Sequence, residues 1–110
     1  MAKINPVKGD AVLAMDGREY VLRADLDNMA AFQSALGVEG VTALLRMVGQ
    51  CDARALREGV ACLAVSGDLS EFGKSNFMAH MTDIQTAVLA AITGGVDREP
   101  GNASSETAAR

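Results

Sequence analysis

Residues 9–23, GDAVLAMDGREYVLR, form two short runs of alternating residues on either side of Asp16-Gly17. An Asp-Gly pair readily adopts the positive φ angles that a two-residue turn requires, so this stretch predicts a β-hairpin. With Asp16 and Gly17 as the turn, the pairing register follows directly. The predicted pairs are Met15 with Arg18, Leu13 with Tyr20, Val12 with Val21, Ala11 with Leu22, and Asp10 with Arg23.

This register gives the hairpin two different faces. One face is expected to be buried and carries Ala11, Leu13, Met15, Tyr20 and Leu22, with the Arg18 stem at its edge. The other face has Val12 and Val21 between the Asp10/Arg23 pair and Glu19. A two-stranded hairpin alone is marginally stable in water, so helices from the following residues are needed to cover the buried face.

Three helices are predicted directly after the hairpin. The first spans about 26–36, with Asp25 as its N-cap and Gly37 as a left-handed stop. A short second helix occupies 40–49, and its apolar stripe consists of Val41, Leu44, Leu45 and Val48. The third runs from about 53 to 65 after an Asp52 cap. Gly59 on its inner face indicates a second backbone passing close by.

The C-terminal half predicts one long helix after a turn-rich segment. Residues 66–75 suit a loop with a short helical turn begun at Ser70 and anchored by Phe72. Ser75 or Asn76 opens the long helix, and Gly94-Gly95 is expected to end it. Its apolar stripe consists of Phe77, Met81, Ile84, Val88, Ala91 and Ile92.

These elements together predict a single α+β domain, with an N-terminal β-hairpin packed against about four α-helices. The domain is expected to span 9–93. Residues 1–8, which contain Pro6, are expected to be an extended lead-in. Residues 94–110 have few apolar side chains to bury and are expected to be a disordered tail.

The composition narrows the possible functions. A net charge of -4 without a Lys/Arg cluster, together with few aromatic residues, argues against nucleic-acid binding. No apolar run approaches the length of a bilayer span, and MAKINPVKGD lacks a signal-peptide core, so a cytoplasmic protein without membrane contact is expected.

No arrangement of residues predicts an enzyme active site, a cofactor or a metal. His80 is the sole histidine, and a general base needs an oriented partner and a nucleophile nearby. We expect it to pack at the edge of the last helix's stripe. Cys51 and Cys62 lack zinc-site spacing and are expected to be reduced thiols in or near the core. A small enzyme or metal-binding regulator, as an alternative, depends on these three residues alone.

Four apolar residues lie off the predicted core stripes: Met47, Val65, Met78 and Leu89. Two interpretations remain open. They could fill a satellite cluster under the loops. Alternatively, they form an exposed patch that binds a partner helix, for which flexible Met side chains are well suited.

The hairpin and first helix, NPVKGDAVLAMDGREYVLRADLDNMAAFQSALGV, resemble the start of the tail assembly chaperone family of gene transfer agents and related long-tailed phages, sometimes labelled a tail-tube family. The residues that carry the likeness are Asn5, Pro6, Gly9, Asp16, Gly17, Arg18, Tyr20, Leu22, Leu36 and Gly37. A weaker likeness follows in LREGVACLAVSGD, at Leu56, Gly59 and Gly67. The resemblance covers about residues 5 to 93. It departs from the family at Ala31 and Gln33, where members often carry acidic residues.

The resemblance implies a non-enzymatic chaperone or adaptor that binds the tape-measure protein and aids assembly of the tail tube. The implied partners are therefore tape-measure and tail-tube proteins in a bacterial cytoplasm. The alternative is a structural tail component, part of the tube or its terminator, that is retained in the particle. The exposed edge of the hairpin also makes a homo-oligomer plausible.

Overall fold

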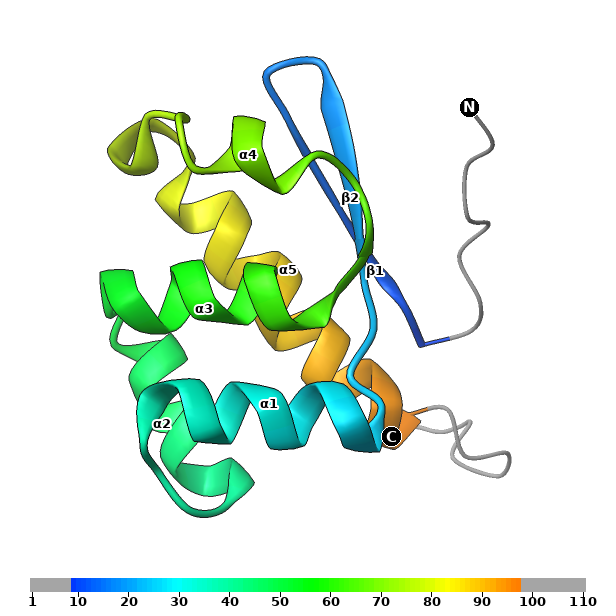
Figure 1. The fold of residues 1–110 in the computed structure, drawn as a ribbon, viewed down its shortest axis with the longest axis vertical. Coiled ribbons are helices and arrows are strands. Elements are labelled where there is room, and N and C mark those ends of the chain that lie inside the picture. The colour runs from blue at the N-terminus through cyan, green and yellow to red at the C-terminus, as the bar shows by residue number, and fades with distance from the viewer. Residues whose placement is uncertain (1–8, 98–110) are drawn as a thin grey trace, which may run out of the picture.

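Residues 9–97 are described by the computed structural model, and they fold into a three-stranded antiparallel sheet and five helices (Figure 1). In chain order the elements are β1 (Ala11–Met15), β2 (Arg18–Leu22), α1 (Leu26–Leu36), α2 (Val41–Gly49), α3 (Ala53–Leu63), β3 (Ala64–Ser66), α4 (Leu69–Phe72) and α5 (Phe77–Asp97). The predicted α+β class is confirmed. The lead-in expected over residues 1–8 and positions 98–110 of the expected tail lie outside the described residues. Within 9–97, no helix combines the length and apolar character needed to cross a membrane.

The predicted hairpin and its register are confirmed. Asp16 and Gly17 form the turn with φ angles of 53° and 75°, and β1 pairs with β2 in the expected antiparallel register. The face predicted to be buried is buried along its whole length. At the open end of the hairpin, the Arg23 guanidinium donates hydrogen bonds of 3.1 and 3.0 Å to the two carboxylate oxygens of Asp10, whose side chain is fully buried.

The third strand was not predicted from the sequence. The helix expected over 53–65 ends at Leu63, where the chain becomes extended and β3 pairs antiparallel with the free edge of β2. The Arg23 N–H donates to the Leu63 carbonyl oxygen at 2.8 Å, which ties this junction to the end of β2. Gly67 follows β3 with φ of +122°, and a Cβ there would collide with the Tyr20 ring. The chain can therefore turn close over the sheet only with glycine at this position.

The helices cover one face of the sheet. In Figure 1, α3 and α5 lie to the left of the hairpin, with α5 passing behind α3, while α1 and α2 lie below α3. α5 packs against β1 and α3, and α1 packs against α3. Fully buried side chains from all these elements meet in one core, including Tyr20, Phe32, Leu44, Leu56, Leu63, Ile84 and Val88.

The predicted caps of the first and third helices are confirmed. The carboxylate of Asp25 accepts a hydrogen bond from the Asn28 N–H at 2.9 Å, and Gly37 ends α1 in the left-handed conformation. The Asp52 carboxylate likewise accepts from the Ala55 N–H at 3.0 Å. Each cap satisfies a backbone N–H that has no partner within its helix, which sets where the helix begins.

Three local predictions were wrong. Val41, assigned to the inner stripe of the second helix, is 41% exposed because it lies in the first turn of α2. Gly59 does face close neighbours, but the atoms nearest to a Cβ placed there belong to the side chains of Phe32 and Val88, where a backbone was expected. The long helix continues through Gly94 to Asp97, so the helix stop expected at Gly94-Gly95 is wrong. A Cβ at Gly94 would collide with the Gly9 carbonyl oxygen, which explains a glycine inside this helix.

Candidate functional site

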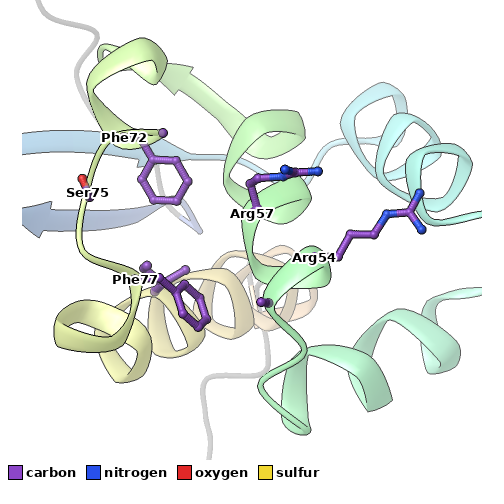
Figure 2. Close-up of a pocket in the computed structure, with 8 residues that line it drawn as sticks. Arg54, Arg57, Phe72, Ser75 and Phe77 are labelled. Carbon is purple, nitrogen blue, oxygen red and sulfur yellow. The ribbon is translucent and has the colours of Figure 1, made fainter.

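An apolar groove with a volume of about 370 Å³ lies between the start of α3 and the segment that joins α4 to α5. The lining residues are Ala53, Arg54, Arg57, Phe72, Gly73, Ser75, Phe77 and Ile84. Figure 2 shows Phe72 and Phe77 on one side of the groove and α3 on the other. The groove residues are far from the hairpin in sequence, but the fold brings Phe72 of the groove into contact with Tyr20 of the hairpin.

The aromatic side of the groove is anchored on the sheet. Phe72 meets the buried Tyr20 edge to face, with ring centroids 5.7 Å apart and ring planes inclined by 70°. Both Phe72 and Phe77 remain half-buried, while Ile84 beneath them is almost fully buried. The two rings therefore present apolar surface to the groove while their other sides are held by the protein.

Local capping shapes the segment that carries these rings. The Asp68 carboxylate accepts hydrogen bonds from the Ser70 hydroxyl at 2.8 Å and from the backbone N–H groups of Ser70 and Glu71, and these bonds lower the pKa of Asp68. The Ser75 hydroxyl donates to the Glu71 carbonyl oxygen at 3.2 Å, after the end of α4. Asp68 begins α4 just before Phe72, so this cap fixes the position of the groove wall.

The charged groups at the groove are basic. Arg54 donates to the Ala35 carbonyl oxygen at 2.9 Å and, as Figure 2 shows, extends toward α1. Arg57 is 65% exposed, and its ion pair, at 3.1 Å, is with the adjacent Glu58. None of the groove's lining residues is acidic. This basic lining contrasts with the net charge of -4 of the whole chain.

The four residues predicted to bind a partner occupy three different elements. Met47 on α2 and Leu89 on α5 are partly buried against the main core. Val65 is half-buried in β3. Met78 is 71% exposed at the start of α5, directly after the groove residue Phe77. Of the four, Met78 alone offers a largely exposed side chain.

The sequence contains one signal that could have pointed to the groove. Phe72 and Phe77 flank the turn-rich stretch 73–76, where the short connection leaves little chain to cover two aromatic rings. The sequence interpretation assigned Phe72 as an anchor and Phe77 to the core stripe, and it assigned no role to Arg54 and Arg57. Their spacing of three residues places both arginines on the same side of α3.

The residues considered for chemistry do not converge. His80 Nε2 lies 3.1 Å from Asp16 Oδ1, so the histidine connects α5 with the hairpin turn. Cys51 and Cys62 are free thiols, and burial together with nearby Glu58 raises the pKa of Cys62. Within residues 9–97, no three His, Cys, Asp or Glu side chains form a potential metal site.

Compared with protein-family models, curated proteins and solved structures, the chain gave no match. The family resemblance therefore depends on the sequence motifs alone.

Proposed function

We propose that this chain is a non-enzymatic tail assembly chaperone or adaptor of a gene transfer agent or related phage-like tail. It binds the tape-measure protein in the cytoplasm of the bacterial host cell and aids assembly of the tail tube around it. The observation that carries this proposal is the apolar groove between α3 and the α4–α5 segment. The motif resemblance of the hairpin and first helix adds the family context.

The physical need for such a protein follows from the expected partner. A long helical tape measure exposes apolar stripes that aggregate unless tube subunits or a chaperone cover them. A groove with two half-buried phenylalanines can cover part of such a stripe and release it later, since no covalent step is required. The net negative charge of the chaperone keeps the complex soluble.

The test is co-expression with the tape-measure and tail-tube proteins of the same phage-like tail, followed by purification through a tag on this chain. The proposal expects a soluble complex with the tape-measure protein. It also expects that a deletion strain makes no tails, and that finished particles contain none of this protein. Failure to bind the tape measure, together with normal tails in the deletion strain, would refute the chaperone function.

A structural tail component is the second candidate, and the outer edge of β1 favours it. Within the described region β1 pairs with β2 alone, and Val12 on this strand is 45% exposed. A hollow of about 360 Å³ lies between β1 and α5, lined by small residues that include Ala14, Ala87 and Ala90. An edge strand of this kind can pair with a neighbouring subunit. Stoichiometric amounts of the protein in purified particles would favour this candidate over the chaperone.

A further inference from the structure

The groove is suited to apolar side chains more than to a polar small molecule. Its volume of about 370 Å³ is within the range of ligand pockets, roughly 300–1,000 Å³. Such pockets orient a small ligand with several convergent polar groups. Here the lining offers the Ser75 hydroxyl, which already donates to the Glu71 carbonyl oxygen, and the two arginines. The other lining residues are apolar and include the rings of Phe72 and Phe77.

The positive charge at the groove indicates which residues lie beside the apolar side chains of a bound partner. Arg57 is mostly exposed, and its present partner Glu58 is its neighbour in sequence. An exposed ion pair of this kind contributes little, so the guanidinium can exchange Glu58 for a carboxylate of a bound partner. A bidentate contact with a carboxylate is also geometrically specific for arginine. Since the lining contains no acidic side chain, no negative charge within the groove opposes such a carboxylate.

We propose that the groove binds an amphipathic helix of another protein, with its apolar residues packed between α3 and the Phe72/Phe77 wall and an acidic residue on its flank paired with Arg57. A helix presents such residues at i, i+3, i+4 and i+7, which places apolar anchors and a flanking carboxylate on adjacent sides. This inference rests on the proposed chaperone function. To that function the inference adds two points: the bound segment of the partner is an acidic amphipathic helix, and the surface that binds it is the groove.

The direct test uses two fluorescein-labelled helical peptides with the same leucine face. One carries glutamates on the flanks of that face, and the other carries lysines. Fluorescence anisotropy at low salt should show the glutamate peptide binding about tenfold more tightly, an energy of about 1.4 kcal/mol. The preference should decrease at high salt, because the contact lies at an exposed rim. Equal binding of both peptides, or binding of neither, would overturn the proposal.

Two pairs of variants locate the binding site. Ala53→Tyr places a ring in the groove from an exposed position, while Ala61→Tyr makes the same change on an exposed part of α3 that does not line it. The first should abolish peptide binding, and the second should leave it unchanged. Arg57→Glu should reverse the preference toward the lysine peptide. Arg46→Glu, which makes the same charge change on α2 away from the groove, should not.

Melting curves of all four variants establish that each is folded, and Arg57→Glu tests the proposal even if Ala53→Tyr does not fold. Peptide binding that survives both groove variants would overturn the inference. A wild-type dimer that Ala53→Tyr converts to monomers would assign the groove to a second copy, which would overturn it as well.

The two proposals fail in different ways. If the folded groove variants still bind the tape-measure protein as the wild type does, the groove inference is wrong and the chaperone function stands. If the wild type binds the glutamate peptide in the groove but never the tape-measure protein, the tape-measure function is wrong. The groove then serves a different acidic amphipathic helix.

Discussion

Phe72 packs edge to face on Tyr20, so the wall of the groove is attached to a fully buried aromatic residue of the sheet. Such a pair contributes about 0.5–1.5 kcal/mol beyond the apolar area that it buries. Replacing Phe72 with Leu should therefore lower the free energy of unfolding by about 1 kcal/mol, measured by urea denaturation. It should also weaken binding of the glutamate peptide. Leu26→Met, a change at an exposed position of α1 that does not line the groove, should leave both measurements unchanged.

The cap at the start of α4 should be sensitive to acid. Hydrogen bonds from the Ser70 hydroxyl and the Glu71 N–H lower the pKa of Asp68 from its ordinary value of 3.8. Because the folded-state pKa is the lower one, the cap stabilises the fold above about pH 4 and loses this effect as the pH falls through the folded-state pKa. NMR titration of the Ser70 and Glu71 amides should show a midpoint below 3.8. In Asp68→Asn this transition should vanish, and its persistence would assign it to another carboxyl group.

The thiol of Cys62 should react slowly. Burial, with a smaller effect from nearby Glu58, raises its pKa above the ordinary value of 9.0, and the thiolate is the reactive form. In a Cys51→Ser variant, alkylation by iodoacetamide at pH 8 should be slower than that of a free thiol in a peptide. Adding Glu58→Gln should move the pH midpoint of the reaction downward. A midpoint at or below 9.0 in the single variant would contradict the burial seen here.

The sequence predicted the hairpin well because three signals agree there. The Asp-Gly pair sets the turn, a two-residue turn leaves one register, and alternation then decides which face is buried. The Asp25 and Asp52 caps were predictable for a similar reason, since each places a carboxylate at the start of an apolar helical pattern. These are local relationships, and they can be read without knowing the rest of the fold.

The missed features depend on contacts between distant residues. β3 has three residues, too few for alternation, and it forms because the edge of β2 lies beside the end of α3. The groove also depends on which sides of Phe72 and Phe77 the fold leaves uncovered, and the short connection between the two rings does not by itself specify these sides. Met47 and Leu89 illustrate the opposite case, because neighbouring elements partly bury flank positions that the helical pattern places outside the core.

Gly59 tests how tightly α3 packs against its neighbours. A Cβ there would lie 3.0 Å from Phe32 Cζ and 3.1 Å from Val88 Cγ1, closer than an ordinary van der Waals contact. Alanine gains about 1 kcal/mol of helix propensity over glycine, while overpacking a core costs about 1–3 kcal/mol. We expect Gly59→Ala to lower the free energy of unfolding by about 1 kcal/mol, because both neighbours are fully buried and have little room to move.

Gly49→Ala is the matched control for this prediction. Gly49 is the last residue of α2, and no atom beyond its chain neighbours and its own helix backbone lies within 4 Å of the position that a Cβ would occupy. The alanine there gains helix propensity without a clash, so stability should stay the same or increase by up to about 1 kcal/mol. Urea denaturation of both variants should therefore give changes of opposite sign, or a loss at Gly59 alone. If Gly59→Ala instead stabilises the protein as much as Gly49→Ala, the α3 interface with Phe32 and Val88 must relax by a few tenths of an ångström at little cost. The packing of α3 against α1 and α5 would then be looser than the close approach at Gly59 indicates.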